Sequence, residues 1–144
     1  MSPIRLVLAG ALCLAAPLVA QDIPYRVVVH ASNPITRLTR EQVSAIFLRK
    51  VTLWDHRQPV LPVDQEPTAP VRLAFTRSVH RRTIASIQTW WQQQTFSGRG
   101  VAPPVRSSDD AVLGYIRLYP NAIGYVHAGA DLGNNVKHVP VTAR

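Results

Sequence analysis

The stretch LTREQVSAIFLRKVTLWD, residues 38–55, carries the clearest helix signals in the chain. Thr39 and Gln42 have the spacing of a capping box, in which a hydroxyl and an amide side chain satisfy free backbone N–H groups at the start of a helix. The stretch therefore predicts a helix over residues 40–48. The apolar face of this helix is expected to consist of Val43, Ile46 and Phe47.

Strands and further helices are predicted on both sides of this helix. Apolar and β-branched runs of strand length indicate the strands, and capping residues followed by apolar residues at helical spacing indicate the helices. Because strands alternate with helices, the sequence predicts an α/β fold: a single lobe of three layers with a mixed, mostly parallel sheet flanked by helices. Strands are expected at residues 25–30, 60–64, 122–126 and 136–141, and helices are expected to begin near Pro70, after Thr83 and after Ser107.

The first 20 residues have the pattern of a cleavable export signal. A positive charge at Arg5 is followed by an apolar run over residues 6–16 and by the small residue Ala20. The run is shorter than the roughly 20 residues that a membrane helix needs. We therefore expect a signal peptide at residues 1–20, a domain at residues 21–144 and a periplasmic location, with no membrane span. The alternative is a buried N-terminal helix.

Cysteine content and charge limit the chemistry of the chain. Cys13, the single cysteine, lies in the expected signal, so disulfides, thiolate metal sites and cysteine nucleophiles are not expected in the mature part. The chain has 16 Lys and Arg residues against 8 Asp and Glu residues, a net charge of +8. Such a surface favours anionic partners. Nucleic acid is not expected, because the basic residues are not interleaved with exposed aromatic residues.

The sequence contains no recognisable catalytic pattern. Its five histidines are scattered singly, and it has no H-E-x-x-H pair, no G-x-S-x-G turn and no glycine-rich phosphate loop. Asp109 and Asp110 are adjacent, but they lie at an expected helix start, where carboxylates interact favourably with the helix dipole. We therefore expect no enzymatic activity, no catalytic residues, no metal site and no cofactor.

Three stretches together resemble the second lobe of the solute-binding proteins of phosphate ABC importers, which have the type 2 periplasmic-binding-protein fold. They are residues 38–55, residues 60–79 (VLPVDQEPTAPVRLAFTRSV) and residues 119–130 (YPNAIGYVHAGA). In that family a helix ending in I-F-x-G-K-I-x-x-W-x-D precedes the ligand loop, and P-G-A-I-G-Y-V closes the lobe. The resemblance implies a periplasmic α/β lobe, a phosphate-like small anion as ligand and an importer permease as partner.

The chain departs from that family in the ligand loop. The family's R-x-D-G-S-G-T motif supplies an arginine, hydroxyls and backbone donors, which suit an oxyanion held at a helix N-terminus. Here the arginine, aspartate, serine and final threonine are replaced, and Pro70 lacks an N–H group. The family's phosphate contacts therefore do not carry over residue by residue. The residues under the motif are Gln65, Pro67, Thr68, Ala69, Pro70 and Val71.

Six residues are candidate ligand contacts, each with a structural alternative. The candidates are Ser32, Asn33, Thr68, Arg72, Ser107 and Ser108. The serines, Asn33 and Thr68 are also ordinary turn or capping residues, and Arg72 is also suited to the surface. Two functions follow as hypotheses. The first is an exported solute-binding protein that binds phosphate or another small anion weakly; the second is a ligand-free adaptor or sensor domain that docks on an envelope protein.

Overall fold

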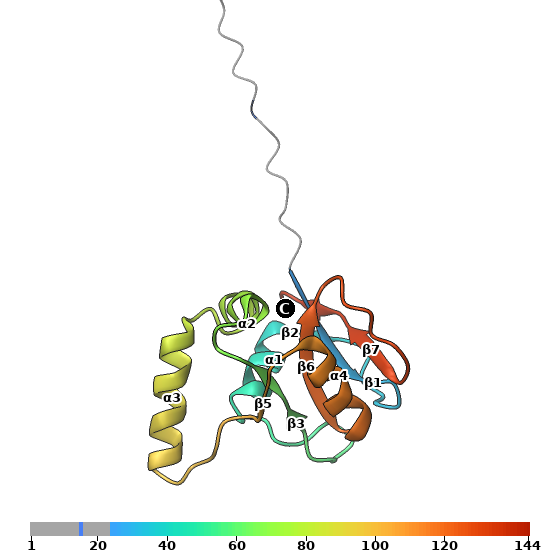
Figure 1. Ribbon diagram of the computed structural model, residues 1–144. Helices are drawn as coiled ribbons and strands as arrows, with labels where there is room; N and C mark the ends of the chain where they lie inside the picture. The colour runs from blue at the N-terminus through green and yellow to red at the C-terminus, as the bar shows by residue number, and fades with distance from the viewer. Residues whose placement is uncertain (1–14, 16–23) are drawn as a thin grey trace, which may run out of the picture.

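The computed structural model describes residues 24–144 and Ala15, so the expected export signal lies outside the described residues apart from Ala15. The described chain has a mixed α/β fold (Figure 1). Strand β1 lies inside the main sheet and runs antiparallel to both neighbours, whereas the other pairing in this sheet is parallel. The strand order of the main sheet is β3 (Leu61–Pro62), β6 (Ala122–His127), β1 (Tyr25–His30) and β7 (Val136–Val139).

Two short parallel pairs of strands accompany the main sheet. Strand β2 (Leu38–Thr39) pairs with β8 (Val141–Thr142), and β4 (Asp64–Gln65) pairs with β5 (Val105–Arg106). Three of the five strand pairings described are parallel, and the two longest are the antiparallel ones that flank β1. The predicted mixed α/β class is confirmed.

The helices cover both faces of the main sheet and one flank: α1 (Arg40–Phe47), α2 (Pro70–Phe75) with the π-helical turn η1 (Thr76–His80), α3 (Ile84–Phe96) and α4 (Asp109–Leu118). Successive side chains of a strand point to opposite faces of a sheet. Accordingly, Val27 and Val29 of β1 pack in one core cluster with α1 and α2, and Val28 packs in another with α4. The sheet is thus the middle of three layers.

Helix α3 lies beside the body of the lobe, at the left in Figure 1. None of its 13 residues is charged. Its buried side chains are Ile87 and Trp91, which pack with Leu48 in a small cluster separate from the two main cores. At its end, Phe96 is 97% exposed. No helix in residues 24–144 is long and apolar enough to cross a membrane.

The predicted capping box of α1 is confirmed. The Thr39 hydroxyl accepts a hydrogen bond from the Gln42 backbone N–H at 3.1 Å, and the Gln42 side chain accepts one from the Thr39 N–H at 2.8 Å. The helix ends at Phe47, one residue before the predicted end. Local hydrogen bonding therefore fixes the start of this helix as the sequence predicts.

Three expected boundaries are wrong at the level of single residues. The predicted strand 60–64 is divided into β3 and β4, because the backbone N–H of Val63 still donates to β6 whereas that of Asp64 donates to Pro104. The predicted strand 136–141 is divided at Pro140, which has no N–H group to donate. The N-cap of α4 is Ser108, whose hydroxyl accepts from the Ala111 N–H at 3.1 Å.

Candidate functional site

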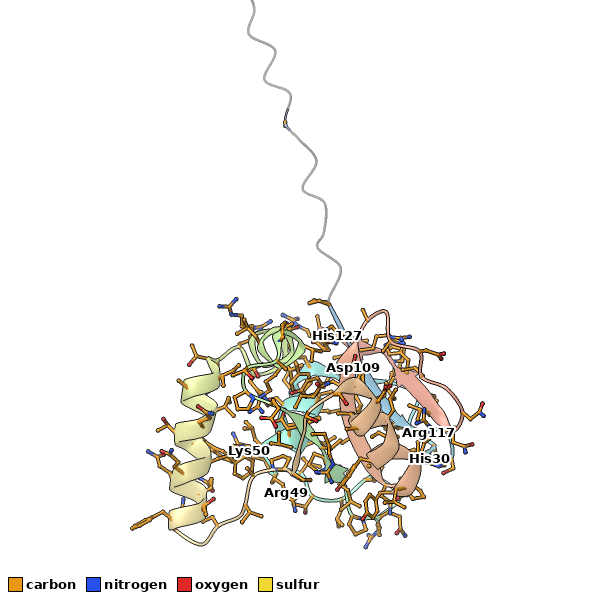
Figure 2. The ribbon with its side chains drawn as sticks, viewed as in Figure 1. His30, Arg49, Lys50, Asp109, Arg117 and His127 are labelled. Atoms are coloured by element: carbon orange, nitrogen blue, oxygen red, sulfur yellow. The ribbon has the colours of Figure 1, made fainter. Side chains whose placement is uncertain are left out.

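A polar cluster lies where the carboxyl end of β6 meets β4 and the start of α4. The amide nitrogen of the Gln65 side chain donates to the backbone oxygen of Tyr125 and to Asp109, both at 2.9 Å. The other carboxylate oxygen of Asp109 lies 2.8 Å from Nδ1 of His127. Figure 2 shows Asp109 and His127 side by side at the start of α4. The cluster therefore joins three elements that are distant in the sequence.

Beneath this cluster, Arg72 and Asp64 form a buried ion pair. Nη1 of Arg72 lies 3.2 Å from the Asp64 carboxylate and donates to the backbone oxygen of Gln65 at 2.6 Å. Arg72 is only 5% exposed, so its expected alternative placement on the surface is wrong. The Arg72 side chain faces inward because it lies on the side of α2 that faces β4.

The hydroxyl of Tyr125 completes this buried group by donating to Asp64. Burial raises the pKa of Asp64 above its ordinary value, although Arg72, Tyr125 and the Gln65 N–H all favour the charged carboxylate. Burial and the Asp64 carboxylate raise the pKa of Tyr125, so its hydroxyl keeps its proton and remains a donor. Each member of the group thus already has a partner inside the protein.

This arrangement disfavours a bound oxyanion at the loop that resembles the family's ligand site. The guanidinium of Arg72 is neutralised by Asp64, and a second carboxylate, Asp109, lies at the start of α4. At the start of α2 the N-cap is Ala69, which has no capping side chain, and Pro70 has no N–H group. An entering anion would approach the Asp109 carboxylate and would find no N–H group at Pro70.

The structure brings together only some of the six candidate contacts. Thr68 lies in an exposed turn before α2, close in sequence to the buried Arg72, and it does not cap the helix. Ser108 caps α4 beside Asp109. Ser107 is exposed, and no side-chain hydrogen bond is described for it. The loop that precedes α2 and the start of α4 therefore lie at the same end of the lobe.

Ser32 and Asn33 lie at the opposite end of β1. This follows from the pairing of Tyr25 with His127, which places the end of β1 that leads into Ser32 away from the polar cluster. The Ser32 hydroxyl lies 2.7 Å from Nδ1 of His30, and Oδ1 of Asn33 accepts from the Ile35 N–H at 3.0 Å. Both contacts stabilise the turn after β1. The prediction that these two residues share a site with Thr68 and Arg72 is not supported by their placement.

Sequence reasoning missed most of the polar cluster. The sequence patterns indicate only strand or replaced loop residues at Asp64, Gln65 and Tyr125, yet all three are buried. A carboxylate directly after an apolar strand, as in VLPVD, is the signal that could have identified Asp64. Among the described residues, no group of three or more His, Cys, Asp or Glu side chains is arranged to hold a metal ion.

Comparison with known proteins identifies the fold. No protein-family model and no curated protein sequence matches the chain. Among solved structures, it is similar to an ABC-type phosphate transport receptor from Vibrio cholerae, with 22% identity, a TM-score of 0.62, and coverage of 82% of this chain and 46% of that one. A structure described as a phosphate ABC transporter substrate-binding protein with bound phosphate, from Clostridium perfringens, gives 22% identity, a TM-score of 0.64 and coverage of 84% and 47%.

A third similar structure, PstS from Borrelia burgdorferi, has 13% identity and a TM-score of 0.58, with coverage of 83% of this chain and 47% of that one. The chain therefore spans less than half the length of these structures. The predicted resemblance is confirmed at the level of the fold. The names of these proteins describe transport and binding.

Proposed function

We propose that this protein is an exported, non-enzymatic relative of phosphate-importer solute-binding proteins that acts as a ligand-free adaptor, docking on an envelope protein such as an importer permease. The observation that carries the proposal is the buried Asp64–Arg72 pair. In this pair the Asp64 carboxylate already neutralises the Arg72 guanidinium, with which an anionic ligand would otherwise pair. The chain thus keeps the fold of a binding lobe, but its buried arginine is paired with a carboxylate of the same chain.

The energetics of the pair support this function. Breaking a buried ion pair by removing one partner costs about 3–5 kcal/mol, because it leaves an uncompensated charge in the interior. A phosphate ion that recruited Arg72 would have to displace Asp64 and bear a similar cost. It would also approach the Asp109 carboxylate at the start of α4.

Weak phosphate binding is the competing function, and the fold shared with a phosphate-bound structure favours it. Isothermal titration of the full processed chain with inorganic phosphate separates the two. The adaptor function predicts no heat of binding up to millimolar phosphate. Heat that fits a micromolar dissociation constant and is lost in Arg72→Met would contradict it and establish the solute-binding function.

Export is a separate part of the proposal. When the complete chain is expressed in a bacterium with two membranes, the protein recovered by osmotic shock should begin near Gln21. N-terminal sequencing of the recovered protein measures this. Recovery of the intact chain, starting at Met1, from the cytoplasmic fraction alone would overturn the expected signal and the periplasmic location.

A further inference from the structure

Three hollows adjoin one another over α1, β8 and the start of β1. The first, of about 390 Å³, is lined by Arg26, Arg40, His138 and Pro140 among others. The second, of about 290 Å³, is lined in part by Arg40, Lys50 and Arg81, and so shares Arg40 with the first. The third, of about 440 Å³, shares Thr142 with the first. Because they share lining residues, the three hollows are neighbours, and we refer to them together as the depression.

The cations that line this depression form what we call the basic track: Arg26, Arg37, Arg40, Lys50, Arg81 and Arg144. Glu41 is the one acidic side chain among the lining residues. The ion pairs found among residues 24–144 are Arg72–Asp64 and His127–Asp109, so no member of the basic track is paired with a carboxylate there. The positive charge of the track is therefore open to a partner.

Two arginines of the basic track are held in place by the backbone. Arg26 donates to the backbone oxygen of Ala130 at 2.5 Å, and Arg40 donates to that of Ala143 at 3.2 Å. A guanidinium has five N–H donors, so Arg40 retains donors for a further acceptor, whereas Nε of Arg26 is buried. Fixed cations lose less conformational entropy on binding than free surface side chains do.

The histidine in the second hollow adds no positive charge at neutral pH. Burial is the largest cause that lowers the pKa of His80 to about 4, and the charges of Arg72, Arg82 and Lys50 lower it further. The ring is therefore neutral at neutral pH and lies 2.8 Å from the Ser44 hydroxyl.

Apolar side chains lie between the cations. Pro140 and Val141 line the first hollow, where Pro140 is exposed, and Ala45 is half-buried in the second. A phosphate polymer would make no use of these apolar surfaces. A polypeptide in which acidic and apolar side chains follow one another would bury the apolar ones and pair the acidic ones, and planar guanidinium groups suit carboxylates well.

We propose that the basic track binds an extended acidic segment of a partner protein, with carboxylates on Arg40 and Lys50 and apolar side chains in the first hollow. This inference rests on the proposed adaptor function and specifies the chemistry of its partner. The track contains neither Arg72 nor Asp64. It is thus a surface separate from the loop that resembles the family's ligand site.

The test is fluorescence anisotropy of a labelled synthetic peptide of alternating glutamate and leucine, titrated with the full processed chain. We expect saturable binding that weakens as salt is added, because exposed charges are screened. Arg40→Glu should weaken binding at least about tenfold, since it reverses the charge shared by two hollows. A carboxylate at the first position of α1 also interacts favourably with the helix dipole, so this variant should fold.

Arg99→Glu is the matched control, because it makes the same change of net charge at an exposed loop residue outside the track. It should weaken binding less than about twofold. Equal weakening by Arg40→Glu and Arg99→Glu would overturn the proposal. So would equally tight binding of a glutamate–serine peptide or of inorganic polyphosphate, because neither can use the apolar hollows.

The two proposals fail in different measurements. Micromolar phosphate binding that depends on Arg72 would overturn the adaptor function. The peptide titration with Arg40→Glu tests binding at the basic track alone. Loss of peptide binding together with silent phosphate titrations would leave the ligand-free site as described and remove the acidic segment as its partner.

Discussion

The rings of Phe75 and Tyr125 stack face to face, with centroids 3.8 Å apart and planes 6° from parallel. Phe75 belongs to the apolar core between the sheet and α2, whereas the hydroxyl at the far end of Tyr125 donates to Asp64. One side chain thus belongs both to the core and to the buried polar group. Substitutions that remove only the Tyr125 hydroxyl and substitutions that remove its ring should therefore have different effects on stability.

Tyr125→Phe should keep the ring stack and remove the donor to Asp64. We expect a loss of about 1–3 kcal/mol in the free energy of unfolding, because a buried carboxylate oxygen loses its partner. Urea denaturation followed by circular dichroism measures this loss. An unchanged unfolding free energy would show that water replaces the tyrosine hydroxyl at Asp64.

Asp64→Asn should destabilise the fold by about 3–5 kcal/mol, because it leaves the Arg72 guanidinium buried without a counter-charge. In Asp64→Asn combined with Arg72→Met no buried charge remains, so the double variant should be more stable than Asp64→Asn alone. A double-mutant cycle by urea denaturation gives the coupling between the two residues. Strict additivity would contradict the pairing described here.

Acid should destabilise the lobe partly through His80. Its pKa is about 4 in the folded protein against 6.5 for the free side chain, so below pH 6.5 the unfolded chain binds the proton more readily. The stability contributed by the neutral ring is complete above pH 6.5 and is lost as the pH falls towards 4. The total is at most about 3 kcal/mol.

The measurement is the unfolding free energy between pH 7 and pH 4 for the natural chain and for His80→Gln. The difference between the two chains should shrink as the pH falls through this range. Parallel pH profiles would contradict the lowered pKa. Comparing the two chains removes the contribution of the carboxylates, which titrate in both.

Gly124→Ala should destabilise the lobe by about 1–3 kcal/mol through overpacking. An added Cβ would lie 2.7 Å from Cγ1 of Val112 and 2.9 Å from Cγ1 of Val63, on the face of β6 that packs against α4. Gly114→Ala is the matched control, since a Cβ there meets nothing within 4 Å on a helix. Thermal unfolding should show a lower Tm for the first variant and a gain of up to about 1 kcal/mol for the second.

The elements predicted correctly are those fixed by local signals. The capping box of Thr39 and Gln42 and the β-branched run of β1 depend on neighbouring residues alone. The division of the strand that contains Pro62 was not predictable in the same way. It arises because the backbone N–H of Val63 donates to β6, whereas that of Asp64 donates to the segment before β5. This segment lies about 40 residues further along the chain.

The polar cluster was beyond local reasoning for a similar reason. Arg72 follows Val71 at the start of α2, and helical spacing alone did not decide whether it faces the core or the solvent. Its orientation depends on Asp64 across the fold, and Asp64 in turn depends on the hydroxyl of Tyr125, 61 residues away. The resemblance predicts an anion site near this loop, whereas the tertiary contacts pair Arg72 with Asp64.

The uncharged helix α3 has a consequence for how this lobe fluctuates. Only Ile87 and Trp91 of its 13 residues are buried, and they pack on Leu48 outside the two cores that hold the sheet. Releasing the helix exposes little apolar surface, at a cost of a few kcal/mol, and leaves both cores intact. We therefore expect α3 to detach first in a subglobal opening, so that its backbone amides exchange with solvent faster than those of β1 and β6.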